Sequence, residues 1–583
     1  MKKLSLPILL ILMLGISNPT TYAQGHWQWG ISSVPANTLS VDPWAARLDD
    51  SGNVIVTGFT NIISGLGIGD YMVYGSDTVF NHGLIQQEIL VKADSTGHFK
   101  WAKGSQLADN WPFGVVTDHS GNIYLFGIYS NYPSCGFDTF RLSNTLTNNM
   151  YYLVKYSPGG QVLWAKNVVP TNGFLGAGSM CIDASDHIYV QGGYDLPTVN
   201  IGSSTLTNIS HGADTFDVFV AKYDTNGNPL WAKSFGGEQN DVPGQIAVSE
   251  SGKLYITGSY YSRTFYAGGY TITNSSISGT GYLQSISYFI KTDTSGHAIW
   301  AHNLPKKITT NQIKIDPLEN IYMIGGMDSI AIVGHDTLVG RGLNDWFFGR
   351  FDSSGTPAWA HSAGNTQNDY GLDISIDNCN HIWVTGGTYR YTSVFNFGDS
   401  SIPVPSGCFD PGIIAEYTDS GRYVSSMALN SGGDDMLFLL PNKHGGFYLA
   451  GDFVSSDMFF GSDTLLHVSN VEALFIAKYH SDSCFGGDTV VPLTVTPMGS
   501  NLLNFNLFPN PASGAFSITC SSIPLSGTMV QICDLAGRVI NEFPLNEKTT
   551  SIRVNGLANG MYICKIITLD GQVAVKKLIL ENK

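Results

Sequence analysis

Four residues with oxygen-bearing side chains recur at matching places along the chain and are the best candidates for binding chemistry. Each stands at the same distance before a glycine that ends a strand pattern, and two of the segments that carry them are similar, GGEQNDVPG and AGNTQNDYG. Carboxylate and amide oxygens bind cations such as Ca²⁺ and the hydroxyl groups of sugars. The candidate binding residues are Asp241, Asp369, Asp434 and Asn110.

The same residues have a simpler interpretation. Asp and Asn side chains often accept hydrogen bonds from nearby backbone N–H groups and so cap turns. The remaining repeats have apolar residues at this position, so any ring of carboxylates is incomplete: Val41, Leu175 and Ile308. The pattern defines no pair of carboxylates at the few ångströms that glycoside hydrolysis requires, so no catalytic residue is assigned. Calcium is the one cofactor the pattern allows, and no other metal site is predicted.

Two alternating hairpin patterns must position these residues. The first is a short apolar run, a polar turn and an alternating strand ending in glycine, as in ARLDDSGNVIVTGFT (46 to 60), and it occurs seven times. The second, as in DVFVAKYDTNGNPLWAK (217 to 233), has a turn glycine four positions before a tryptophan in five copies. The sixth copy has Ser425 in place of the tryptophan, and the seventh keeps only its first strand (473 to 484).

The stretch GHWQWGISS (25 to 33) supplies the strand that the seventh repeat lacks, because Gly25 precedes Trp29 by the same four positions. Two hairpins make a four-stranded blade, and radial repetition of such blades is the β-propeller. The sequence therefore predicts an all-β fold: a seven-bladed β-propeller over residues 24–484, closed by its N-terminal strand and followed by a small C-terminal β-sandwich. The repeated tryptophans and tyrosines are expected to pack between blades.

A further element recurs in the long connections between the second and third strands, as in YGSDTVF (74 to 80) and VGHDTLV (333 to 339). Loops that gather on one face of a propeller are the usual binding surface. The alternative is that these elements are extra edge strands of the blades.

The N-terminal 23 residues have Lys2 and Lys3, an apolar run and small residues before Ala23, which is typical of a secretory signal peptide cleaved between Ala23 and Gln24. No later segment has the roughly 18 apolar residues of a transmembrane helix. The net charge of −16 argues against a nucleic acid partner. The eight cysteines form no CxxC pair.

Two parts of the chain resemble known families. The pattern DVFVAKYDTNGNPLWAKSFGG followed by IAVSESGKLYITGSY resembles the SBBP-type β-propeller repeat of exported bacterial proteins. After the Pro, Thr and Gly-containing linker 485–503, residues 504–583 resemble the type A C-terminal sorting domain of the type IX secretion system in Bacteroidetes. The motif residues that carry this second resemblance are Pro509, Asn510, Pro511, Gly514, Asp534, Gly537, Gly560, Tyr562, Gly571, Lys576 and Lys577.

The resemblance to the sorting domain implies the type IX secretion machinery as a partner and a secreted or cell-surface location. No HExxH, GxSxG or P-loop motif occurs. We therefore expect a non-catalytic binding or scaffolding propeller with an extracellular glycan or protein ligand. Two alternatives stay open, namely a propeller hydrolase or lyase acting on extracellular polysaccharide or protein, and a passive structural surface protein.

Overall fold

The computed structural model of the chain describes 25 segments: residues 25–36, 39–62, 70–82, 84–130, 132–144, 148–173, 178–210, 215–276, 284–389, 394–404, 410–429, 437–442, 445–454, 457–460, 463–466, 472–481, 505–509, 512–513, 515–520, 528–533, 539–545, 547–553, 557, 560–567 and 573–580. These segments contain fifty β-strands and no helix, so none of them includes a helix that could cross a membrane. The predicted signal peptide, with Ala23 and Gln24, and the candidate residue Asp434 lie outside the described residues. The chain divides into two compact units, Met1–Gly487 and Asp488–Lys583.

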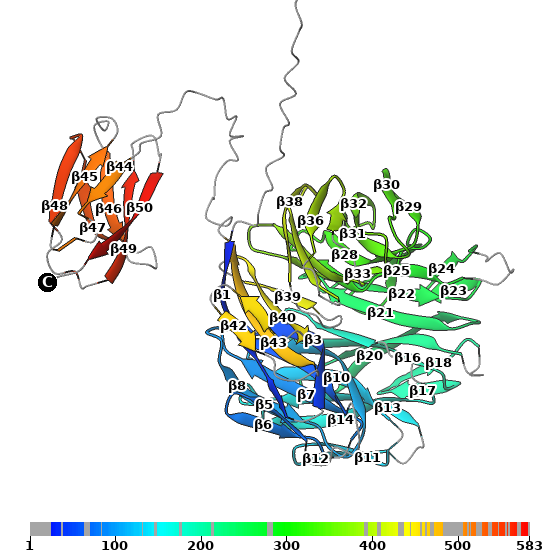
Figure 1. The fold of residues 1–583 in the computed structure, drawn as a ribbon. Helices are drawn as coiled ribbons and strands as arrows, with labels where there is room; N and C mark the ends of the chain where they lie inside the picture. The colour runs from blue at the N-terminus through cyan, green and yellow to red at the C-terminus, as the bar shows by residue number, and fades with distance from the viewer. Residues whose placement is uncertain are drawn as a thin grey trace, which may run out of the picture. The chain divides into compact units, whose positions relative to one another are not determined.

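The described part of the first unit contains seven sets of four antiparallel strands, here named sheets 1 to 7 (Figure 1), and a hairpin from the next sheet extends sheets 3 and 5 to six strands. Sheets 1 to 3 comprise, in strand order, β3 (Leu39–Leu48), β4 (Val54–Ile62), β7 (Gln86–Ala93) and β8 (Phe99–Gly104); β9 (Asn110–Thr117), β10 (Ile123–Tyr129), β13 (Asn149–Tyr156) and β14 (Val162–Thr171); and β15 (Gly178–Ile182), β16 (Ile188–Tyr194), β19 (Asp217–Tyr223) and β20 (Pro229–Gly237). Sheets 4 to 6 comprise β21 (Asp241–Val248), β22 (Leu254–Tyr260), β25 (Ile286–Thr292) and β26 (Ala298–Asn303); β27 (Gln312–Ile315), β28 (Ile321–Met327), β31 (Asp345–Phe351) and β32 (Pro357–Gly364); and β33 (Asp369–Ile376), β34 (Ile382–Thr388), β37 (Gly412–Tyr417) and β38 (Tyr423–Ala428).

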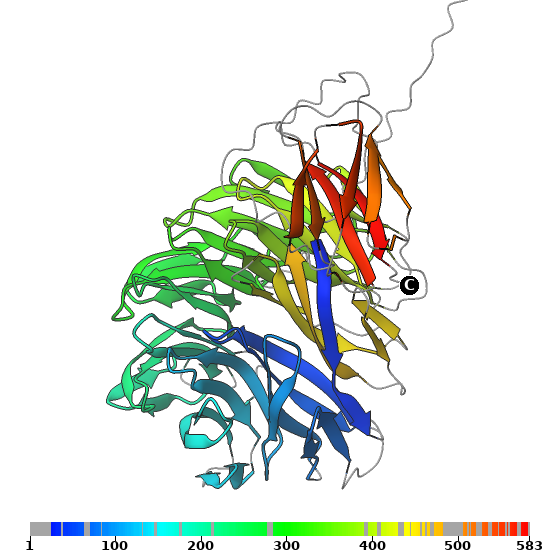
Figure 2. The same ribbon diagram turned by 90° about the vertical axis from the view of Figure 1, so that its left-hand side faces the viewer.

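Sheet 7 joins the two ends of the first unit. It comprises β39 (Leu437–Pro441), β40 (Phe447–Phe453), β43 (Ala473–Ser481) and, from the other end of the chain, β1 (Gly25–Ser32). β1 pairs antiparallel with β43 from Gly25↔Ser481 to Ser32↔Phe475. Figures 1 and 2 both show dark-blue β1 beside the yellow strands. The N-terminal strand thus occupies the position that the spacing of Gly25 and Trp29 predicts.

Each four-stranded sheet carries a short hairpin between its second and third strands, here called its edge hairpin. The seven edge hairpins are β5 (Tyr71–Tyr74) with β6 (Asp77–Phe80), β11 (Ser134–Phe137) with β12 (Phe140–Ser143), β17 (Thr198–Ile201) with β18 (Ser204–Thr207), β23 (Thr264–Ala267) with β24 (Tyr270–Thr273), β29 (Ile330–Val333) with β30 (Asp336–Val339), β35 (Val394–Phe397) with β36 (Ser400–Pro403), and β41 (Asp457–Phe460) with β42 (Asp463–Leu466).

Several edge hairpins also bond to the sheet that precedes them. β23 pairs with β20 of sheet 3, β35 pairs with β32 of sheet 5, and β5 pairs with β2 (Val34–Ala36), which follows β1. The recurring elements such as YGSDTVF are therefore extra strands at the sheet edges. Backbone pairing of this kind covers strand edges that would otherwise be open.

Local turn chemistry explains why the first two strands of each sheet form a tight hairpin. In sheet 1 the Asp49 carboxylate accepts hydrogen bonds from the backbone N–H groups of Ser51 and Asn53, at 3.0 and 2.9 Å. Gly52 has φ of +77°, a conformation that glycine adopts without steric cost. Asp118, Asp183, Asp316 and Asp377 accept the same backbone bonds in other sheets. The carboxylates of these aspartates therefore serve to hold the turns together.

The repeated tryptophans join consecutive sheets. Trp101, on the last strand of sheet 1, lies under the turn between the third and fourth strands of sheet 2, and its indole N–H donates to Pro158 O at 3.1 Å. A Cβ on Gly160 in that turn would lie 2.9 Å from the ring, and the φ of Gly160 is +82°. Trp29 of β1 contacts Gly97 of sheet 1 in the same way. Ser425 stands at this position in sheet 6, because β43 and β1 come from opposite chain ends and no turn joins them.

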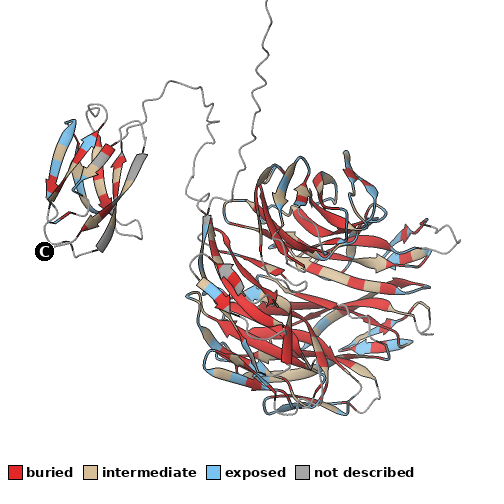
Figure 3. Ribbon diagram, in the orientation of Figure 1, coloured by how far each residue is buried: buried red, intermediate tan, exposed pale blue. Residues whose placement is uncertain are grey.

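The core lies on the faces of the sheets, where each sheet packs against its neighbours. The strands in the middle of the sheets are buried along nearly their whole length, whereas exposed residues concentrate in the edge hairpins and turns (Figure 3). One cluster, for example, combines Tyr124 of sheet 2 with Ile188 and Phe219 of sheet 3.

The second unit is a two-sheet β-structure. Its strands are β44 (Phe505–Phe508), β45 (Ala515–Cys520), β46 (Met529–Cys533), β47 (Val539–Pro544), β48 (Thr549–Arg553), β49 (Gly560–Ile567) and β50 (Val573–Leu580). The sheets have the orders β44-β45-β48 and β47-β46-β49-β50, and residues of both share one buried cluster. Of the motif residues, Pro509 follows β44, Gly560 and Tyr562 lie on β49, and Lys576 and Lys577 lie on β50. Asn510, Pro511, Gly514, Asp534, Gly537 and Gly571 lie outside the described residues.

Candidate functional site

The first strands of the seven sheets line one cavity of about 600 Å³, here called the channel. Its walls are short segments of β3, β9, β15, β21, β27, β33 and β39, together with residues next to them. The volume is within the range of small-molecule binding sites. The walls bring together residues that are hundreds of positions apart in the sequence.

Two basic side chains lie in this channel, Arg47 on β3 and Lys314 on β27. Both stand two positions before the turn aspartate of their sheet, Asp49 and Asp316 respectively. The corresponding residues of the other five sheets carry no positive charge: Val116, Cys181, Ala247, Ser375 and Leu440. At this position of the repeat the two cations therefore contrast with small or apolar residues in the other sheets.

Lys314 is partly neutralised by Asp373 of β33. The Lys314 ammonium lies 3.7 Å from Asp373 Oδ1. Asp373 is 3% exposed, and its carboxylate also accepts the backbone N–H groups of Ile374 and Leu439, both at 2.8 Å. Burial raises the pKa of Asp373 and lowers the pKa of Lys314, while the attraction between the two opposes both shifts. The carboxylate oxygens are thus already engaged.

Arg47 has no such partner. Its side chain is exposed to the channel, and within the described segments it makes neither a hydrogen bond nor an ion pair. The surrounding protein displaces water from the guanidinium and lowers its pKa, while the more distant charges of Asp373 and Asp50 act in the opposite direction. The guanidinium nevertheless stays charged at any physiological pH.

Amide groups and one indole complete the polar lining. Gln245, Asn311 and Gln312 lie in the walls. Asn311 donates to Gly371 O at 2.9 Å. Gln312 accepts the backbone N–H of Ile313 at 3.0 Å, and its amide nitrogen donates to no other described residue. Trp44 also lines the channel and packs against Phe59, with ring centres 5.7 Å apart. Amides and an aromatic ring are groups that contact hydroxyls and apolar faces of small ligands.

The residues that the sequence singled out lie elsewhere. Asp241, Asp369 and Asn110 are fully buried at the first positions of β21, β33 and β9, at the ends of the connections between sheets, and none of them lines the channel. Asp241 accepts the backbone N–H of Gly237 at 2.6 Å, and Asp369 accepts that of Asn365 at 2.7 Å. Asn110 accepts hydrogen bonds from the Glu88 N–H and the Ser105 hydroxyl, at 2.9 and 2.8 Å. These three side chains brace the connections between sheets.

Two of these aspartates have an acidic neighbour that the sequence pattern did not predict. Asp217 stands close to Asp241, and Asp345 stands close to Asp369. Gly364 lies between the members of the second pair, because a Cβ there would collide with Asp345 and would lie 2.8 Å from Asp369 Oδ2. Burial raises the pKa of Asp241 to about 8 and that of Asp217 and Asp369 to about 7. The sequence holds one sign of this similarity, because the segments that end at Asp241 and Asp369 share a pattern, GGEQND and GNTQND.

Comparison with known proteins identifies the second unit. The family of secretion system C-terminal sorting domains matches residues 506–581. This tail is a sorting domain. It indicates export through the type IX secretion system to the cell surface or the extracellular space, and it implies an interaction with that machinery.

Relatives of the remaining chain are distant. The WD repeat-containing protein L264 of Acanthamoeba polyphaga mimivirus is 25% identical over 417 residues, which are 60% of this chain and 29% of that protein. Regulatory protein FlaEY of Caulobacter vibrioides is 30% identical over 106 residues, which are 18% of this chain and 11% of that protein. The chain thus spans less than a third of the length of either relative.

Solved structures give only weak similarity. Phage phi92 endosialidase is 8% identical with a TM-score of 0.38, covering 96% of this chain and 89% of its own. PorZ of Porphyromonas gingivalis, a surface component of the type-IX secretion system, is 10% identical with a TM-score of 0.24, covering 93% of this chain and 81% of its own. Similarity at this level supports no inference about activity.

Proposed function

We propose that the first unit is a seven-bladed β-propeller of the SBBP-repeat type, closed by β1, that acts outside the cell and binds a ligand in its channel without converting it. The propeller is supported by the seven four-stranded sheets and by the pairing of β1 with β43. The contact between Trp29 and Gly97 repeats the contact between other consecutive sheets and so supports closure. Export with removal of the signal peptide after Ala23 accords with the sorting tail.

The observation that carries the binding role is the channel itself, in which Arg47 is charged and unpartnered among the described residues. A role without catalysis is supported by Asp373, the one carboxylate in the described lining, because two backbone N–H groups and Lys314 already engage it. Hydrolysis of a glycoside normally requires two carboxyl groups placed on either side of the bond.

The test is a binding screen of the purified full chain against extracellular glycans and polymers, with and without calcium, compared with a channel-filling variant. Ala247 lies in the channel wall, so A247W is expected to abolish saturable binding. S401W, which adds the same ring on exposed β36, is the matched control and is expected to bind normally.

Three outcomes would overturn this proposal. Binding that survives in a folded A247W variant would place the ligand outside the channel. Conversion of a bound ligand into a product would favour the hydrolase or lyase alternative. Absence of binding to every glycan, polymer and protein probe would favour a passive structural protein.

A further inference from the structure

We infer that the channel is an oxyanion site, in which Arg47 and Lys314 bind the carboxylate of a small acidic ligand such as a sugar acid. This inference rests on the proposed binding function and names the ligand class of the same channel. It starts from the contrast between the two cations and the chain as a whole, which has a net charge of −16. A local positive charge in such a chain favours anions at this place.

The charge balance within the channel leaves room for one anion. Among the described residues, the titratable residues of the lining are Arg47, Lys314, Asp373 and Cys181. Burial raises the pKa of the Cys181 thiol, which is therefore neutral, and Asp373 offsets one of the two positive charges. The described part of the lining thus has one positive charge in excess. A bound carboxylate would balance that charge.

Arg47 and Lys314 line the same cavity. Burial is the main cause of the lowered pKa of Lys314, and the positive charge of Arg47 adds to it, so the two cations repel each other. An oxyanion between them would relieve this repulsion. A guanidinium presents N–H groups that fit a carboxylate in a two-pronged hydrogen bond, and Arg47 has none of its donors occupied within the described residues.

The rest of the lining suits a ligand with hydroxyl groups. Gln245 and Gln312 offer amide groups, and Trp44 offers an aromatic face. Within the protein the local dielectric is lower than in water, which strengthens the attraction between an oxyanion and the two cations. A sugar acid combines the carboxylate, the hydroxyls and the size that the channel accommodates.

Binding is tested on the purified full chain by titration calorimetry at constant ionic strength with D-glucuronate, D-glucose and inorganic phosphate. Glucuronate is expected to bind at one site, and glucose, its neutral counterpart, at least tenfold more weakly. R47Q should weaken glucuronate binding roughly tenfold or more, and R47K should restore most of it. K100Q, which removes the charge of the exposed side chain of Lys100 on β8, three strands away from β3, is the matched control and should bind as the parent does.

Each other outcome has a distinct meaning. Phosphate that displaces glucuronate from the same site would show that the channel selects the oxyanion and not the sugar. Equal binding of glucose and glucuronate, or normal binding by a folded R47Q, would overturn the oxyanion inference. If neutral glycans still bind and A247W blocks them, the proposed binding function survives while this inference fails. If none of the three probes binds, the inference fails, and the broader screen decides the binding function.

Discussion

The two ends of the sheets differ in whether buried charges are paired. The turn end is the end at which short turns join the first strand to the second and the third to the fourth, and the connection end is the end at which the chain passes to the next sheet. At the turn end of sheets 1 to 3, the lysine of the third strand has an acidic partner in the turn of the same sheet: Lys92 lies 2.9 Å from Asp49, Lys155 lies 3.4 Å from Asp118, and Lys222 lies 3.4 Å from Asp183. At the connection end, Asp217 and Asp241, and likewise Asp345 and Asp369, are buried beside each other with no ion pair to a basic side chain among the described residues. Matched pairs can stay ionised inside a protein, whereas unmatched carboxyls shift their pKa and keep a proton.

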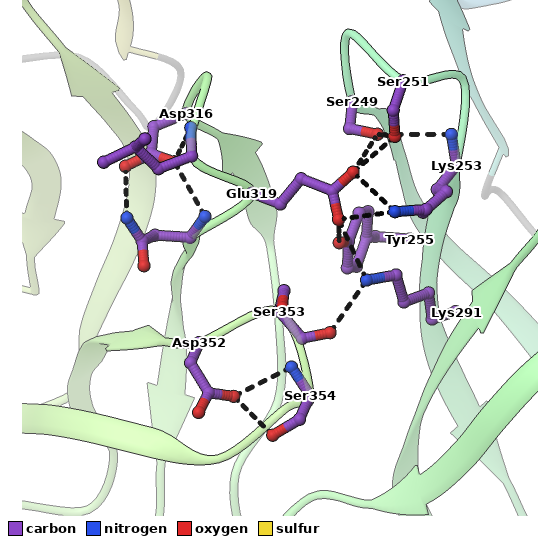
Figure 4. A network of polar contacts seen from close by, with 12 residues as sticks. Ser249, Ser251, Lys253, Tyr255, Lys291, Asp316, Glu319, Asp352, Ser353 and Ser354 are labelled. Carbon is purple, nitrogen blue, oxygen red and sulfur yellow. Dashed lines mark hydrogen bonds and ion pairs between the residues drawn. The ribbon is translucent and has the colours of Figure 1, made fainter.

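Where one sheet lacks its acid at the turn end, the next sheet supplies it. Sheet 4 has Ser249 at the position of the turn aspartate, and Glu319 from sheet 5 reaches across to Lys253 and Lys291, at 3.0 and 3.1 Å (Figure 4). Burial disfavours the charge on Glu319, but hydrogen bonds from Ser251, Lys253 and Lys291 outweigh it and lower its pKa to about 2. Charge pairing at the turn end therefore extends over sheets 1 to 4, whereas Lys478 of sheet 7 has no acidic partner among the described residues and burial lowers its pKa.

The largest effect is expected from breaking the contacts between sheets at the turn end. W101A removes a ring that is 8% exposed and covers the Gly160 turn of the next sheet. Loss of a buried tryptophan lowers the free energy of unfolding by about 3–5 kcal/mol. Denaturant unfolding of the full chain measures this change. F80A, which truncates a ring that is 52% exposed, is the control and should cost far less; similar losses in both variants would contradict the role of Trp101.

Removing the substitute acid should have the next largest effect. E319Q leaves Lys291, whose side chain is 7% exposed, without its carboxylate, and a buried charge left unpaired costs about 3 kcal/mol. The double variant S249D/E319Q places an acid where other sheets have it and should recover most of this loss. Unfolding of the single and double variants by denaturant provides the comparison. A double variant no more stable than E319Q would show that the position of the acid, and not its charge, matters.

The buried carboxyl groups at the connection end predict that the stability of the fold falls as the pH rises. Since the folded-state pKa of Asp241 is about 8 and that of Asp369 about 7, the folded chain holds protons that the unfolded chain releases above about pH 4. The free energy of unfolding should therefore fall as the pH rises from about 4 to 8. D241N and D369N should flatten this fall, gaining about 1–3 kcal/mol over the parent at pH 8 and little at pH 5.

Thermal or denaturant unfolding across this pH range measures the effect, and added calcium sharpens it. If calcium stabilises the parent at pH 8 but not D241N, a cation and not a proton balances the acid pair, as the oxygen-rich pattern in the sequence suggests. A parent whose stability is flat between pH 4 and 8 would show that these carboxyls are ionised in the folded chain.

The two ends also differ in how far the sequence could predict them. Residues such as Trp101 and Gly160, or Lys92 and Asp49, recur at fixed places in most repeats, so their contacts follow from the period. The pairing of β1 with β43 follows in the same way from Gly25 and Trp29. Burial of Asp241 beside Asp217 depends on how the connection folds back on its sheet. The sequence pattern is the same whether an aspartate only caps a turn or is also buried beside a second aspartate, so the pattern alone could not predict the acid pair.

The channel could not be found from sequence motifs for a different reason. Arg47 and Lys314 belong to sheets 1 and 5 and line the same cavity only when strands of all seven sheets surround it. Each alone is an ordinary charged residue near a turn. Aligning the repeats on the turn aspartate does place both at one position, but only the structure shows that this position faces the channel.

The smallest effect on stability is expected at Arg47, and it sharpens the contrast between a basic residue with a partner and one without. Within the described residues Arg47 makes no hydrogen bond or ion pair, so R47Q should change the free energy of unfolding by no more than about 0.5 kcal/mol. K92Q, by contrast, leaves Asp49 without its ion pair at a site where both side chains are under 8% exposed, and should cost about 3 kcal/mol. Denaturant unfolding of both variants at one pH tests the difference. A large loss in R47Q would mean that Arg47 holds the sheets together, and its charge would then be a structural feature and not one reserved for a ligand.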